Sequence, residues 1–128
     1  NQKKDFSILV ALTGVEVFRN DVLNLISEID SIKFKIKLHP ADNLKTVKKS
    51  FNKKWPKNFS LVKESFSNLI CNANLLISSN STTILDSISI GVPVIIIGGK
   101  SNLTQNPIPE KIPKSLYKIV YSIELRNQ

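Results

Sequence analysis

The chain has 128 residues and a mass of 14.3 kDa, which suits one compact domain and is too short for two ordinary ones. Hydrophobic residues make up 41% and charged residues 22%, so the composition excludes a disordered tail and a coiled coil. With 18 Lys and Arg against 10 Asp and Glu, the formal net charge is +8. This charge is compatible with an anionic partner, and the alternative is that lysines spread along the chain form an ordinary solvated surface. A non-catalytic domain whose lysine surface binds nucleic acid stays open as one alternative function.

The chain has one cysteine and one histidine, which excludes an internal disulfide and a histidine–cysteine metal site. Cys71 falls in an expected helix and is predicted to be buried. The longest apolar run, 92–97, is far too short to cross a membrane, and no signal peptide precedes Phe6, so a cytoplasmic protein is expected. The first residue is Asn1 rather than Met, which predicts a piece of a longer chain.

Short apolar runs alternate with stretches of helical periodicity along the first half of the chain. The stripe of the first helix, which includes Val17, is expected to face a sheet. Proline at position 40 ends the second run, and Asp42 is expected to cap the helix that follows it. In chain order the sequence predicts a strand over 6–12, a helix over 17–29, a strand over 33–38, a helix over 42–52 and a strand over 59–62.

The second half continues the alternation. It predicts a short helix over 66–72, a strand over 75–79, a helix from 80–83 to Gly91, a strand over 92–97, an irregular loop over 99–117, and an edge strand with a tail over 118–128. Strands that alternate with helices favour parallel pairing through right-handed crossovers. We therefore expect an α/β fold in one domain, 1–128: a Rossmann-like, doubly wound parallel sheet of about five to six strands with helices on both faces.

Ligands of such sheets bind where strands end, and one strand end is rich in hydroxyl groups. The free amides of a helix start, together with Ser and Thr hydroxyls, form a phosphate site without any lysine. The alternative is a simple cap, in which one side chain satisfies the amides and Thr83 forms a capping box with Asp86. Asp86 is also a candidate acceptor for a ribose diol. The candidate binding residues here are Ser79, Asn80, Ser81, Thr82, Thr83 and Asp86.

Two further strand ends carry candidate residues. His39 and Pro40 end the second strand, where the proline would fix the direction of the imidazole. His39 could donate a hydrogen bond to a phosphate or act as an acid on a leaving phosphate; the alternative is a half-buried histidine bonded to a carbonyl. Thr13 and Gly14 end the first strand, where a glycine permits close approach of a bound group or merely forms a turn.

These motifs together resemble the carboxyl-terminal half of GT-B glycosyltransferases. The resemblance lies in 37–40, in 76–86 and in 91–95, and it is nearest to bacterial surface-polysaccharide enzymes of the polysialyltransferase, capsule Kdo-transferase and CDP-glycerol glycerophosphotransferase types. In those families an HP motif and a serine/threonine-rich motif hold the phosphate of the donor. The resemblance implies that His39 contacts or protonates the donor phosphate, and that Ser79, Ser81 and Thr82 bind it.

The resemblance also implies partners. The chain would be the donor-binding domain of a longer enzyme, with a CMP-, CDP- or UDP-linked sugar as substrate, no further cofactor and no specific nucleic acid. The amino-terminal acceptor domain would lie elsewhere in the parent, so the domain alone is expected to be inactive, and peripheral association of the parent with the inner face of the membrane stays open. UDP-sugar 2-epimerases are similar too, with a serine-acid-serine-glycine-glycine pattern where this chain has residues 79–83.

Overall fold

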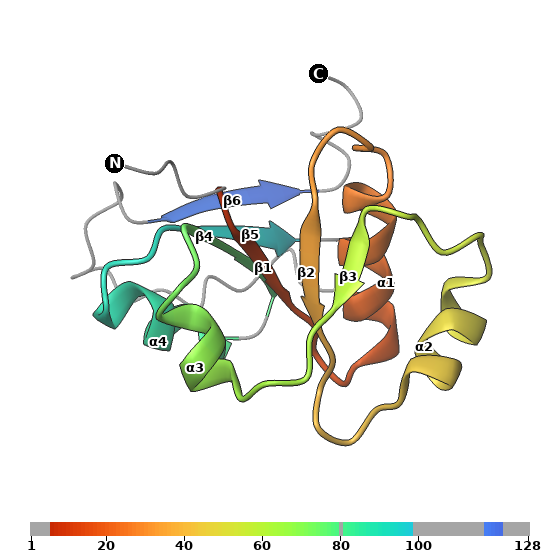
Figure 1. Ribbon diagram of the computed structural model, residues 1–128, viewed down its shortest axis with the longest axis horizontal. Coiled ribbons are helices and arrows are strands. Elements are labelled where there is room, and N and C mark those ends of the chain that lie inside the picture. The colour runs from red at the N-terminus through yellow and green to blue at the C-terminus, as the bar shows by residue number, and fades with distance from the viewer. Residues whose placement is uncertain (1–5, 80, 99–116, 122–128) are drawn as a thin grey trace.

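A computed structural model describes residues 6–79, 81–98 and 117–121, and in it a six-stranded parallel sheet lies between two layers of helices (Figure 1). The strands are β1 (Ile8–Ala11), β2 (Phe34–Lys37), β3 (Phe59–Leu61), β4 (Leu75–Ser78), β5 (Val94–Gly98) and β6 (Tyr117–Tyr121). The helices are α1 (Glu16–Ile26), α2 (Leu44–Phe51), α3 (Phe66–Ile70) and α4 (Ser81–Ser89). The predicted doubly wound α/β fold is confirmed.

The strand order is β3-β2-β1-β4-β5-β6, and every pairing in it is parallel. The winding therefore reverses between β1 and β4. Ala11 at the end of β1 lies opposite Lys37 on one side and Ser78 on the other. The loops that follow β1, β2 and β4 consequently leave the same edge of the sheet side by side, at the point where doubly wound folds bind ligands.

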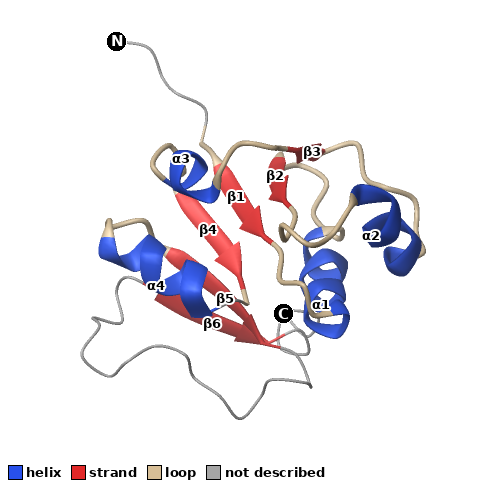
Figure 2. Cartoon of the chain, turned by 90° about the horizontal axis from the view of Figure 1, so that it is seen from below, coloured by secondary structure: helices blue, strands red, loops and turns tan. Residues whose placement is uncertain are grey.

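Both faces of the sheet are covered, as Figure 2 shows, with α1 and α2 on one side and α3 and α4 on the other. Side chains of β1 alternate between the two faces, and all of them are buried. Val10 and Ile36 belong to the core under α1 and α2, whereas Leu9 and Leu76 belong to the core under α3 and α4. Because both faces of β1 are packed, this strand is a rigid base for the loop that follows it.

Helices α1 and α3 end earlier than expected. Helix α1 ends at Ile26, because Ile29 donates its amide to the Ile26 carbonyl at 3.1 Å and closes a tighter turn there. Its buried stripe includes Arg19, whereas Val17 is 50% exposed, so the expected apolar stripe is wrong at its start. Helix α3 ends at Ile70, which is its one buried residue. Cys71 follows the helix and is exposed, so its predicted burial is wrong.

The end of α4 follows the sequence prediction. Gly91 adopts a left-handed conformation with φ of 84°, which a glycine accepts without strain, and it ends the helix before β5. The predicted edge strand is confirmed as β6, which pairs parallel to β5 and begins at Tyr117. The predicted loop over 99–117 otherwise lies outside the described residues. None of the helices in the described part of the chain has the length and apolar character needed to cross a membrane.

Candidate functional site

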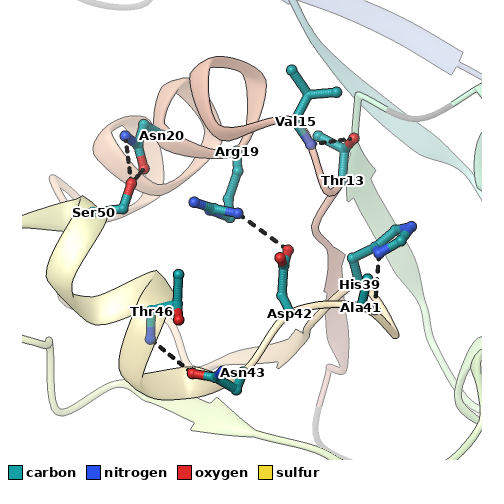
Figure 3. Close-up of polar contacts among 10 residues, drawn as sticks. All are labelled: Thr13, Val15, Arg19, Asn20, His39, Ala41, Asp42, Asn43, Thr46 and Ser50. Atoms are coloured by element: carbon teal, nitrogen blue, oxygen red, sulfur yellow. Dashed lines mark hydrogen bonds and ion pairs between the residues drawn. The ribbon is translucent and has the colours of Figure 1, made fainter.

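The imidazole of His39 lies against Gly14, in the turn that follows β1. Its Nδ1 accepts a hydrogen bond from the backbone N–H of Ala41 at 3.1 Å (Figure 3). A Cβ atom added to Gly14 would lie 3.2 Å from the same Nδ1, so the glycine is what allows the ring to approach the β1–α1 turn this closely. Because Nδ1 is an acceptor, the proton of the neutral ring lies on Nε2. Nε2 makes no hydrogen bond with any described residue.

Thr13 shapes the turn that supports this ring. Its side chain is buried, and its Oγ1 accepts a hydrogen bond from the backbone N–H of Val15 at 3.2 Å. Val15 is the N-cap residue of α1 and supplies no side-chain cap of its own. Thr13 therefore serves to turn the chain from β1 into α1, and Gly14 is the residue of the pair that touches His39.

Asp42 has a different role from the helix cap expected for it. The N-cap of α2 is Asn43, whose Oδ1 accepts from the Thr46 N–H at 2.9 Å. Asp42 donates its own amide to the His39 carbonyl at 2.9 Å, which closes a turn around Pro40. Its carboxylate pairs with Nη1 of Arg19 on α1 at 3.1 Å. The cap moves one residue along the chain because this turn brings Asp42 toward α1.

Ser78 joins the end of β4 to its neighbours. The residue is fully buried; its Oγ donates to the Ala11 carbonyl at 3.2 Å and lies 2.9 Å from Oγ1 of Thr83. A carbonyl only accepts, so Thr83 is the donor when Ser78 bonds to Ala11. Helix α4 begins at Ser81, two residues before Thr83, and the capping box of Thr83 with Asp86 is therefore wrong. These hydroxyls instead fix α4 against β1.

The next residue, Ser79, differs from Ser78 in its hydrogen bonding. Its Oγ is buried and has no hydrogen-bond partner among the described residues. The residue lies between the end of β4 and the first turn of α4, whose amides have no partner within the helix. Of the other predicted ligands, Asn80 lies outside the described residues, and so do the side chains of Ser81 and Thr82. A buried hydroxyl without a partner beside a helix start is the arrangement that a phosphate oxygen would complete.

The two candidate groups flank β1. His39 follows β2 and Ser79 follows β4, so their backbones lie two strand spacings apart, about 10 Å. Between them the chain turns at Gly14. Asp86 lies one helical turn into α4, is exposed, and makes no side-chain hydrogen bond with a described residue. The structure thus brings His39 against Gly14 and places Ser79 after the strand on the other side of β1.

An open pocket of about 410 Å³ lies beside His39, over the carboxyl ends of β2 and β3. Its walls are Lys37, Leu38, His39, Pro40, Asp42, Leu44, Leu61, Val62 and Lys63. Sequence reasoning missed the part from β3, namely 61–63, although Lys63 stands right after a predicted strand end. In the residues that the structure describes, no three His, Cys, Asp or Glu side chains gather to hold a metal ion. Besides apolar side chains, the lining of the pocket includes two lysines, Lys37 and Lys63, and the acidic residue Asp42.

No protein-family model and no curated protein matches the chain. Among solved structures it resembles UDP-GlcNAc 2-epimerase from Neisseria meningitidis bound to UDP-GlcNAc, at 21% identity and a TM-score of 0.62, over 98% of this chain and 35% of that one. It also resembles S. aureus MnaA in a co-structure with UDP, at 14% identity and 0.61, over 99% and 38%. A Listeria monocytogenes protein assigned as a UDP-N-acetylglucosamine 2-epimerase is 12% identical with a TM-score of 0.57, over 97% and 38%.

The chain thus spans little more than a third of the length of these structural neighbours. At identities of 21% and below, the likeness is one of fold. It agrees with the strand order and with the two helix layers on the sheet. The chain has the Rossmann-like α/β fold that these structures share.

Proposed function

We propose that this chain is a nucleotide-sugar-binding domain that holds the phosphate of its ligand at the carboxyl ends of β1, β2 and β4. The observation that carries the proposal is the pair of unused groups at the switch point: Nε2–H of His39 and Oγ of Ser79, on opposite sides of Gly14. Both groups can donate to a phosphate oxygen. The amides of the first turn of α4 add partial positive charge on the same side.

His39 is proposed as a binding residue rather than an acid. An imidazole that delivers a proton from Nε2 must hold a proton on Nδ1 afterwards. Here Nδ1 accepts from the Ala41 amide, and that bond would be lost. The geometry favours a ring that keeps its Nε2 proton and donates a hydrogen bond to the donor phosphate throughout.

The pocket beside His39 suits the nucleoside. Its volume of about 410 Å³ lies in the range of small-molecule sites. Leu61, Val62 and Pro40 offer apolar surface, while Lys37 and Lys63 stand at its border. A ligand whose phosphate lies over Gly14 would thus place its base or sugar among these residues.

For the parent protein we propose a glycosyltransferase of bacterial surface-polysaccharide synthesis, with this chain as its donor half. The support is the pair of motifs, His39-Pro40 and the serine and threonine run over 78–83, which the fold brings to one edge of the sheet. Transfer would require an acceptor-binding half outside this chain. The second candidate is a relative of UDP-sugar 2-epimerases, which is supported by the likeness of the fold to a UDP-GlcNAc 2-epimerase and to S. aureus MnaA.

A titration of the isotope-labelled chain with CMP, CDP and UDP, followed by amide shifts, tests the proposal. We expect saturable shifts at Gly14, His39 and Ser79, and a nucleotide affinity at least about tenfold above that of the matching nucleoside, which lacks charge-assisted hydrogen bonds. Preference for CMP or CDP would favour the transferase over the epimerase relative, whereas preference for UDP would fit both. Equal binding of nucleoside and nucleotide would contradict a phosphate site.

The sharpest variant is His39→Asn. The Asn Oδ1 can take the place of Nδ1 and accept from the Ala41 amide, while the donor at Nε2 is lost. We expect about tenfold weaker nucleotide binding with little change in stability. Unchanged affinity would remove His39 from the site.

A further inference from the structure

We propose that Arg19 and Asp42 form a buried positioning pair that holds the His39 loop in its binding conformation, an inference that rests on the proposed function. Asp42 also lines the pocket beside the ring, so the role proposed for the pair is read from the His39 ring itself, without ligand. Asp42 lies three residues after His39, and Arg19 lies five residues after Gly14. The ion pair therefore joins the segment that carries the ring to the segment on which the ring lies.

The contacts reach His39 along two routes. The Asp42 amide donates to the His39 carbonyl at 2.9 Å, while its carboxylate is held by Nη1 of Arg19 at 3.1 Å. Beneath the ring, Gly14 leaves the space that a Cβ would fill at 3.2 Å from Nδ1. Figure 3 shows the two bonds that end on this loop, from Arg19 of α1 to the Asp42 carboxylate and from the Ala41 amide to the His39 ring. A shift of Asp42 would tilt the ring and weaken the bond from Ala41 to Nδ1.

The burial of Arg19 argues that the pair is more than a surface contact. Arg19 is 3% exposed and the Asp42 side chain 17%. Nε of Arg19 is buried without a partner among the described residues, so the guanidinium is not fully satisfied. Burying a charge in this way is costly, and an apolar pair of the same size often folds as well. The pair is better explained by the loop geometry that it sets than by stability alone.

A neighbouring contact provides a matched control. Asn20, the next residue of α1, bonds to Oγ of Ser50 on α2 at 3.1 Å. This contact also joins α1 to the segment after β2, is also partly buried, and is drawn in the same view (Figure 3). It touches neither His39 nor its turn. If any contact between α1 and the chain after β2 were enough, both contacts would affect His39 equally.

His39 is the only histidine, so its two ring nitrogens give unique resonances. At a pH that keeps the imidazole neutral, a fixed Nε2–H tautomer shows two widely separated nitrogen signals, and a mixture of tautomers shows signals that move together. We would record them for the unaltered chain, for Asp42→Asn, for the double variant Arg19→Met with Asp42→Leu, and for Ser50→Ala. The double variant buries no unpaired charge, so it serves if Asp42→Asn does not fold.

We expect the two signals to converge in both test variants, with about tenfold faster exchange of the Ala41 amide and about tenfold weaker UDP binding, while Ser50→Ala matches the unaltered chain. Emission from Trp55, the only tryptophan, verifies folding in each case. Unchanged nitrogen signals in a folded test variant would overturn the proposal, and so would failure of both test variants to fold. Absence of UDP binding to the unaltered chain would count against the proposed function alone, because the nitrogen signals are read without ligand.

Discussion

The loop after β2 and the loop after β4 flank the same strand, yet their polar groups are used differently. After β2, His39 and Asp42 are held by contacts within the protein: the Ala41 amide on Nδ1, the Arg19 ion pair, and Gly14 beneath the ring. After β4, Ser78 is bonded on two sides, whereas the neighbouring Ser79 has a buried Oγ without a partner among the described residues. The β2 loop thus holds its donor, the His39 ring, in a fixed direction, whereas the β4 loop leaves its donor, the Ser79 hydroxyl, without a bond to a described residue.

The difference teaches how a binding site can be arranged before its ligand arrives. A ring whose direction is fixed loses little entropy on binding, so its hydrogen bond contributes more to affinity. An unpaired buried hydroxyl costs free energy in the empty domain, and a ligand oxygen removes that cost. The predictions below ask whether the two loops respond to substitution as this contrast requires.

The largest expected effect is on stability and lies in the β2 loop. Asp42→Ala leaves the buried guanidinium of Arg19 uncompensated, and we expect a loss of about 3 kcal/mol in the free energy of unfolding. Asp86→Ala removes an equal charge from an exposed site and should change stability by less than about 0.5 kcal/mol. Urea unfolding followed by Trp55 fluorescence measures both. Equal losses for the two variants would show that the ion pair contributes nothing specific.

Two adjacent serines give the next test, in the β4 loop. Ser78→Ala removes a fully buried hydroxyl that bonds to Ala11 and Thr83, and we expect a loss of about 1.5 kcal/mol in stability. Ser79→Ala removes a hydroxyl without a partner among the described residues, so stability should stay the same or rise slightly. Nucleotide affinity should fall about fivefold for Ser79→Ala. If Ser79→Ala lowered stability as much as its neighbour does, the contrast between the two serines would be lost.

The smallest expected effect is on ligand affinity alone. Gly14→Ala places a Cβ at 3.2 Å to 3.4 Å from three ring atoms of His39, so the ring must move by a few tenths of an ångström. We expect about threefold weaker nucleotide binding with stability nearly unchanged. Gly91→Ala is the control: its φ of 84° makes alanine strained, at about 1 kcal/mol in stability, without any effect on binding. Calorimetric titration separates the two, and a Gly14→Ala variant with full affinity would mean that the ring position is not critical.

Local patterns predicted most of the fold. The apolar run of β1, the alternation in β2 and the left-handed Gly91 each carry their own signal, and short connections between strands and helices left parallel pairing as the natural arrangement. The same logic placed His39 and Ser79 at strand ends, because a strand end can be read without knowing its neighbours.

Contacts between distant segments could not be read in this way. Arg19 lies on a helix whose period marks apolar positions, and only the turn closed by Asp42 reveals why a charge is buried there. The different roles of Ser78 and Ser79 depend on the register of β4 against Ala11, which no local pattern contains. The place of Lys63 in the pocket wall could not be predicted for the same reason. It depends on the pairing of β3 with β2, two strands that α2 separates in the sequence.

The most direct test of the account is the affinity of UDP and of uridine for the unaltered chain, for His39→Asn, for Ser79→Ala and for the double variant. The central claim is that one ligand phosphate lies between these two side chains. We therefore expect each single variant to weaken the binding of UDP but not that of uridine. The double variant should lose less binding free energy than the sum of the two single losses, because a phosphate that has lost its bond to one group also binds the other group less well. Equal losses for UDP and uridine in every variant would contradict the claim.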